Sequence, residues 1–233
     1  MTRLSSALAL VLLASCGTTA TTTIAGDAFD FGIGLATGGI ASAHVFVLEN
    51  PALTTTTDAT GHFVITGVPV GSDATLVMEH PSYVLIQTGT HEVPAGGLTR
   101  ITFQAVTPDT RNALALVLHL DIDDTRCQMV TTVTRIGRSV YDPGAHGEAG
   151  VIVTIDPPLP AASGPVYFNS SVIPDPTLTQ TSDDGGVLFT NVPPGEYTWT
   201  ATKAGATFAQ VRMNCRAGVL VNAAPPWGLQ RLQ

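Results

Sequence analysis

The sequence predicts an all-β protein built from two copies of one module, and two observations carry this prediction. Charged residues make up only 12 % of the 233 residues, well below the roughly 25 % that is usual in soluble domains. Threonine, valine, glycine and proline are abundant instead, which is typical of β-rich proteins with many turns. Second, "TTDATGHFVITGVPVG" at 56–71 aligns without a gap to "QTSDDGGVLFTNVPPG" at 180–195. A repeat of this kind indicates two similar structural units.

Each unit is predicted to be a set of strands joined by tight turns. In the second copy, apolar and threonine side chains alternate along 187–190 and 197–202, and a period of two marks a half-buried strand. Between them, Val-Pro-Pro-Gly at 192–195 must turn, because proline has no N–H for the ladder. We interpret Asp183-Asp184-Gly185-Gly186 as a hairpin turn and not as a catalytic acid pair, because Ala59 occupies one of the acid positions in the first copy.

The segment between the copies predicts a short helix from 108 to about 119. Pro108 and Asp109 follow Thr107, and proline in the first turn with an acid near the positive end is typical of a helix start. We expect this helix to pack between or against the two units, with a buried strand as the alternative. The C-terminal tail is broken by prolines, and we expect its Trp227 to dock onto the second unit.

The repeated pattern resembles the carboxypeptidase regulatory-like domain, a transthyretin-like β-sandwich that serves mainly as an accessory module. The first copy carries the match at Ala43, Val45, Val47, Thr57, Asp58, Gly61, Phe63, Ile65, Val68 and Pro69. The second carries it at Val151, Val153, Ile155, Thr181, Gly185, Phe189, Val192, Pro193, Pro194, Gly195 and Tyr197. Ser182 and Val187 depart from the pattern. The resemblance covers roughly 22–106 and 127–223, and it implies an all-β fold of two tandem transthyretin-like sandwiches joined by a short helix.

The N-terminus predicts a lipid anchor. Arg3 is followed by an apolar run that is too short to span a bilayer but suits a signal peptide. Leu13-Ala14-Ser15-Cys16 resembles the lipobox of bacterial lipoproteins, which implies diacylation of Cys16 and cleavage before it; an ordinary secretory signal is the alternative. Gly17, and not an aspartate, follows the cysteine, so the sequence shows no signal for retention in the inner membrane. We therefore expect a lipid-anchored protein of a bacterial cell envelope, at the outer membrane.

These patterns divide the chain into five predicted parts. They are a signal peptide at 1–15, a tether at 16–23, the first sandwich at 24–107, the connecting helix at 108–120, and the second sandwich with its tail at 121–233.

Two cysteines remain for a disulfide once Cys16 is assigned to lipid. Cys127 and Cys215 are the other two of the three cysteines, and a pair in an oxidising compartment is most simply a disulfide. It would close a loop of nearly ninety residues and add about 4 kcal/mol of stability in the chain-entropy model. Two buried free thiols are the alternative.

The sequence offers no recognisable catalytic or cofactor-binding motif. We therefore predict no catalytic, cofactor-binding or metal-binding residue. The formal charge of -8 argues against nucleic acid as a partner. Histidines are the only candidate metal ligands, and four of the six, His44, His62, His80 and His91, fall in the first unit. Alternation predicts that His44 and His62 point outward. We interpret all four histidines as solvated and not as metal ligands.

The expected function is that of a non-enzymatic envelope protein, a binding or structural module. Its membrane contact would be the lipid at Cys16, and its partner a polysaccharide or another envelope protein; the oligomeric state is not predicted. Candidate recognition loops lie at 30–39, 141–148 and 169–179, and we favour the last because the first unit has no counterpart. A solvated connection is its alternative. The rival function is a metal-binding protein or an enzyme that uses the His-bearing face.

Overall fold

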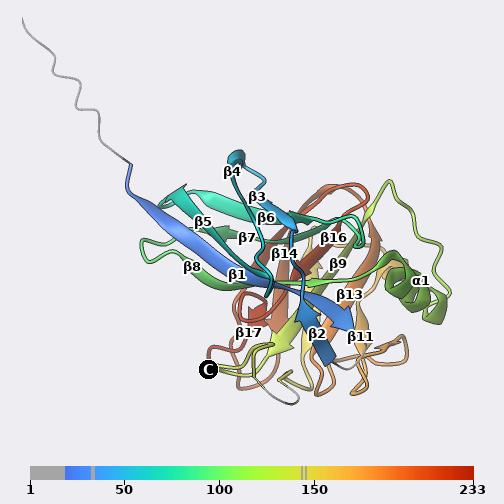
Figure 1. Ribbon diagram of the computed structural model, residues 1–233. Coiled ribbons are helices and arrows are strands. Elements are labelled where there is room, and N and C mark those ends of the chain that lie inside the picture. The colour runs from blue at the N-terminus through green and yellow to red at the C-terminus, as the bar shows by residue number, and fades with distance from the viewer. Residues whose placement is uncertain (1–18, 33–34, 143, 145) are drawn as a thin grey trace, which may run out of the picture.

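The computed structural model describes residues 19–32, 35–142, 144 and 146–233, and it confirms the predicted all-β fold class (Figure 1). The first half contains β1 (Thr21–Gly32), β2 (Leu35–Gly39), β3 (His44–Val47), β4 (Asn50–Thr56), β5 (His62–Pro69), β6 (Asp73–Glu79), β7 (Ile86–Glu92) and β8 (Leu98–Ala105). Helix α1 (Pro108–Val117) follows. The second half contains β9 (Cys127–Thr134), β10 (Ile152–Asp156), a 3-10 helix (Ala161–Ser163), β11 (Val166–Phe168), β12 (Pro174–Asp175), β13 (Gly186–Val192), β14 (Gly195–Thr202), β15 (Val211–Cys215), β16 (Leu220–Ala223) and β17 (Leu229–Gln230).

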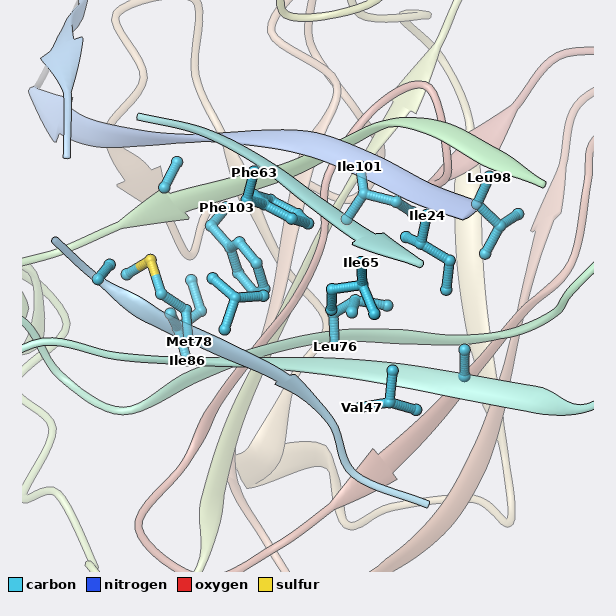
Figure 2. Close-up of a cluster of buried hydrophobic side chains, with 14 of the residues drawn as sticks. Ile24, Val47, Phe63, Ile65, Leu76, Met78, Ile86, Leu98, Ile101 and Phe103 are labelled. Carbon is cyan, nitrogen blue, oxygen red and sulfur yellow. The ribbon is translucent and has the colours of Figure 1, made fainter. Parts of the chain in front are cut away.

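The first half is a sandwich of two layers. In one layer, β1 pairs with β2 and β5 in antiparallel fashion and with β8 in parallel; the other layer has the order β4-β3-β6-β7. Alternation along each strand sends every second side chain between the layers. Figure 2 shows this core, in which Phe63 and Phe103 lie with their ring centroids 5.7 Å apart.

The second half forms a core of its own. Strands β16, β9, β13, β11 and β12 lie side by side, and β10, β14 and β15 form a second group. Trp199 is fully buried between them and packs edge-on against Phe189, with ring centroids 4.8 Å apart. Burial of a large aromatic pair of this kind is a major source of the stability of a sandwich.

Strand β7 connects the two halves within one sheet. It pairs with β6 of its own half, with β15 in antiparallel fashion and with β16 in parallel. The second-half strands and the β4-β3-β6-β7 layer therefore belong to a single 13-stranded sheet. The sequence predicted two sandwiches in tandem and did not predict that they share a sheet. The domain bounds themselves stay a prediction.

The connecting helix is confirmed, and the alternative of a buried strand is wrong. The helix runs from Pro108 to Val117, and the Thr107 hydroxyl caps it by accepting from the N–H of Thr110 at 3.2 Å. None of the helices in the described residues is long and apolar enough to cross a membrane.

Three expectations need correction or lie outside the described residues. The glycine-rich segment 30–39, expected as a loop, belongs largely to the hairpin of β1 and β2. The tether was predicted to extend to residue 23, but β1 already begins at Thr21. The predicted signal peptide and the lipidation site at Cys16 fall within 1–18, outside the described residues.

Trp227 docks onto the first half, so the expectation that it packs on the second unit is wrong. Its indole Nε1 donates to the carbonyl of Thr99 at 2.7 Å, and its ring packs against the first core. The physical reason is that the tail follows β16, which itself lies beside β7.

The repeat seen in the sequence is reproduced at the level of single hydrogen bonds. The buried Thr57 hydroxyl accepts from the N–H of Ala43 at 2.9 Å and donates to the carbonyl of Ile40 at 2.6 Å. Thr181, which aligns with Thr57, makes the same pair of bonds in the second half, at the same two distances. Each threonine thus ties the turn before β5 or β13 to the segment that leads into β3 or β10, respectively.

We expect Thr57→Val to lower the free energy of unfolding by about 1–3 kcal/mol, because it leaves a buried N–H and a buried carbonyl without their partner while the side-chain shape is kept. Urea denaturation measures the change. Thr56→Val is the matched control, because Thr56 is exposed on β4. Equal stability of the two variants would contradict the assigned role.

Candidate functional site

A groove of about 700 Å³ lies between α1 and the outward face of the second-half sheet. Along β9, Met129, Thr131 and Val133 are buried, so the alternate residues point outward. These outward residues form part of the groove floor, together with positions on the flanking strands β13 and β16. The floor residues are Gln128, Val130, Thr132, Gly186, Leu188, Thr190, Leu220 and Asn222.

Helix α1 and the segment after it form one wall of the groove. Leu114, Ala115 and Leu118 line it, which is the spacing of one helix face. Leu116 and Val117 point the other way and are 74 % and 48 % exposed. The helix was predicted from its start signals, but the groove was not. Apolar residues lie on both faces of this helix, so the sequence contained no one-sided pattern that could have indicated the groove.

The three candidate recognition segments all contribute to this groove. Phe31 comes from 30–39, Asp142 and His146 come from 141–148, and Ser170, Val172 and Pro174 come from 169–179. Their convergence was not predictable from the sequence, because they lie on three different strand connections. The three segments that were predicted separately therefore line one groove.

A hydrogen-bonded cluster fixes the 139–142 segment against the first half. The Tyr141 hydroxyl donates to Asp27 at 2.6 Å and accepts from Thr102 at 3.2 Å. Burial, and then the hydrogen bond to Asp27, raises the pKa of Tyr141 well above its usual value, so the phenol stays a neutral donor. The guanidinium of Arg100 stacks over the same ring at 4.6 Å and donates to Ser139 at 2.6 Å. This cluster holds the neighbouring groove residues in place.

Asp183 and Asp184 have different partners, as expected for a turn and not for an acid pair. Asp183 is exposed and pairs with Arg135 at 3.3 Å. Asp184 accepts from the N–H of Gly186 at 2.9 Å, and burial raises its pKa above the usual value while that hydrogen bond opposes the shift. The turn interpretation missed one point, since both Asp183 and Asp184 line the groove.

The four histidines of the first half have separate neighbours. His44 and His62 are exposed, as alternation predicted; His44 hydrogen-bonds Thr54 at 2.7 Å and His62 pairs with Asp27 at 2.9 Å. The ring of His80 packs against Tyr83, and that of His91 against Trp227. Across the described residues, no group of three or more His, Cys, Asp or Glu side chains could hold a metal ion.

The predicted disulfide is confirmed, and the alternative of two free thiols is wrong. Cys127 at the start of β9 is bonded to Cys215 at the end of β15, and both are buried in the second core. The bond closes a loop with a sequence separation of 88. It lies beside the groove floor, because Gln128 is the next residue of β9.

These features define an all-β sandwich protein with a groove on one face. No family model matches the chain, so the resemblance to the carboxypeptidase regulatory-like domain stays a prediction. No curated protein matches it either.

The solved structures that the chain resembles include a Bacillus anthracis protein and two pilins. The Bacillus anthracis TIE protein is 14 % identical with a TM-score of 0.29, over 86 % of this chain; the chain spans 32 % of the length of that protein. A point mutant of the shaft pilin SpaA from Lactobacillus rhamnosus GG is 9 % identical with a TM-score of 0.28, over 91 % of this chain and 97 % of the pilin. A streptococcal ancillary pilin is 11 % identical with a TM-score of 0.28, over 91 % and 68 %.

Proposed function

We propose that the protein is a non-enzymatic binding protein of a bacterial cell envelope, anchored by lipid at Cys16, and that it holds an elongated apolar ligand in the α1 groove. The observation that carries the proposal is the apolar lining of a groove of this size. Small-molecule sites typically enclose about 300–1,000 Å³ and are lined mainly by apolar side chains. The apolar lining includes Val106, Leu114, Leu118, Val130, Leu188 and Leu220.

Two charged residues of the groove lie at opposite ends of its floor, whereas the uncharged polar side chains of Gln128, Thr132, Thr190 and Asn222 are spread along it. Arg126 precedes β9 and pairs with Asp123 at 3.2 Å, whereas Asp184 lies near the far end of β9, where Thr132 pairs with Gly186. Between them, Val130 and Leu188 stand on neighbouring strands. The end groups already have partners within the chain, so they do not require a charged ligand. This arrangement favours a long apolar chain, such as an acyl or isoprenoid chain, over the polysaccharide expected from the sequence.

The course of β1 supports presentation of the groove away from a membrane. The strand runs from Thr21 to Gly32 (Figure 1) and begins five residues after the proposed anchor. Phe31, near its end, lines the groove. Ten residues of extended chain span about 33 Å. A lipid at Cys16 would therefore hold one end of β1 near the bilayer and leave the groove open at the other end.

Blocking the groove floor tests the proposal. Residues 19–233 contain both cores and all of the described strands, so this fragment can be titrated with a dansyl-labelled undecanoic acid and its fluorescence followed. We expect Leu188→Trp to weaken binding of this probe at least about tenfold, because the larger side chain fills space that the ligand occupies.

Leu116→Trp is the matched control, because Leu116 is exposed on the opposite face of α1. It should bind the probe like the unaltered fragment, and thermal unfolding should show that both variants are folded. Absence of probe binding, or equal binding by both variants, would contradict the groove as the site. Mass spectrometry of the N-terminal peptide tests the anchor separately, since an unmodified Cys16 in the mature protein would overturn it.

A further inference from the structure

A second pocket, of about 540 Å³, lies at the other end of β7 from the groove. Val84, just before β7, lines the groove, whereas Thr90, His91 and Glu92 at the end of the strand line this pocket. The start of β15 and the segment 226–230 close its other sides. The pocket is therefore separate from the groove and exists only because the tail and β15 dock onto the first half.

One polar atom at this pocket lacks a partner. The Nε2 atom of His91 is buried and makes no hydrogen bond to any described residue. Burial, and then the nearby Arg212, lowers the pKa of His91 to about 4, so the ring is neutral near pH 7. A neutral imidazole can donate from one nitrogen and accept at the other. An unpaired buried polar atom costs about 1–3 kcal/mol, so a group that reached this nitrogen from the pocket would stabilise the site.

An aromatic ring forms part of the pocket wall. Trp227 lines it, and its orientation is fixed by the 2.7 Å hydrogen bond from Nε1 to the carbonyl of Thr99. Its ring centroid is 5.4 Å from that of His91. A tryptophan that is held by its own N–H offers a rigid apolar surface next to polar groups.

Planar polar side chains line the same pocket as Trp227. Arg212 and Asp73 form a bidentate ion pair, with one of its two hydrogen bonds at 2.9 Å, and both side chains remain about half exposed. Gln210, Gln230 and Glu92 also line the pocket. Together these groups supply both hydrogen-bond donors and acceptors.

We propose that this pocket binds a neutral sugar unit of a saccharide chain, with the C–H face of the sugar ring on Trp227 and its hydroxyls on Gln210, Gln230 and the Arg212–Asp73 pair. Sugar hydroxyls both donate and accept, which matches this mixed set. Two carboxylates against one guanidinium, in a chain with a formal charge of -8, disfavour an anionic ligand such as a phosphate or a sulfated glycan. The charged rim equally disfavours the apolar chain proposed for the groove.

Calorimetric titration of residues 19–233 with cellohexaose, maltohexaose and chitohexaose tests this site. We expect at least one of these neutral saccharides to bind, and the double variant Gln210→Ala/Gln230→Ala to weaken that binding about tenfold, because two neutral hydrogen bonds are lost. The imidazole nitrogen resonances of His91 should shift when the saccharide is added, which a merely structural histidine would not show.

Gln180→Ala is the matched control, because Gln180 is exposed and lies outside the pocket residues. It should leave the affinity for saccharide unchanged, and so should Leu188→Trp in the groove. Absence of binding by all three saccharides at millimolar concentration overturns the proposal. Binding that survives in the double variant without a shift of the His91 resonances overturns it as well. Neither result bears on the groove, which is tested with a different probe.

Discussion

Replacing both Cys127 and Cys215 by alanine is expected to lower the free energy of unfolding by about 4 to 5 kcal/mol, which is the loop-closure term for a loop of this length. The bond joins the first residue of β9 to the last of β15, two strands that lie on either side of the second core. Without it, the unfolded chain gains the freedom of this long loop. Urea denaturation of residues 19–233 measures the loss.

Reduction provides the internal control for this prediction. A reductant should lower the stability of the unaltered protein by a similar amount and leave that of the double variant unchanged, because only the former has a bond to lose. Equal stability of the oxidised and reduced forms would contradict the entropic role of the bond. Both side chains are buried, so a small further loss from the cavity at each alanine is expected in the variant alone.

The elements that local patterns define were predictable from the sequence. The turns at Asp58 and at Ser182–Gly185 could be located because each depends on residues within a few positions of one another: Asp58 accepts from Thr60 N–H at 2.8 Å, and Ser182 from Asp184 N–H at 3.1 Å. The strands on either side alternate with a period of two, which survives any tertiary arrangement. The same holds for the helix start at Thr107.

The shared sheet was not predictable, because it depends on contacts between distant segments. Gly89 on β7 illustrates the difficulty. A Cβ atom at this position would come within 3.1 Å of the carbonyl oxygen of Arg212 and of the Val211 side chain, so the glycine permits β15 to lie close to β7. In the sequence, the same residue reads only as a weak point in a strand. No residue near Gly89 in the sequence indicates that it will pack against Val211 and Arg212, more than a hundred residues away.

The groove and the second pocket were not predictable either, because they too depend on contacts between distant segments. Each is lined by side chains from both halves, as with Phe31 and Leu188 in the groove or His91 and Trp227 in the pocket. The sequence predicted three segments of the groove to be exposed recognition loops and favoured 169–179, because the first unit has no counterpart of it. It could not show that they converge, because convergence is decided by how β7 joins β15 and β16.

We expect Glu148→Ala to have the second large effect and to lower the free energy of unfolding by about 2–3 kcal/mol. The Glu148 side chain is only 8 % exposed and accepts from Lys203 and, at 3.2 Å, from Arg231. Removal of one member of a buried ionic group typically costs about 3–5 kcal/mol. Lys203 and Arg231 are each about a third exposed, so water can partly replace the lost carboxylate and the expected cost falls below that range.

The equivalent position in the first half shows which side chain could replace Glu148. Ile40 occupies the position of Glu148 there, since Thr57 donates to its carbonyl as Thr181 donates to that of Glu148. An apolar side chain is therefore compatible with this site. The triple variant Glu148→Ile/Lys203→Met/Arg231→Met should regain most of the stability lost by Glu148→Ala, because apolar replacement of a complete buried ionic group is often neutral. Urea denaturation distinguishes the two, with the exposed Glu196→Ala as control; if the triple variant is less stable than Glu148→Ala, the ionic group itself stabilises the second half.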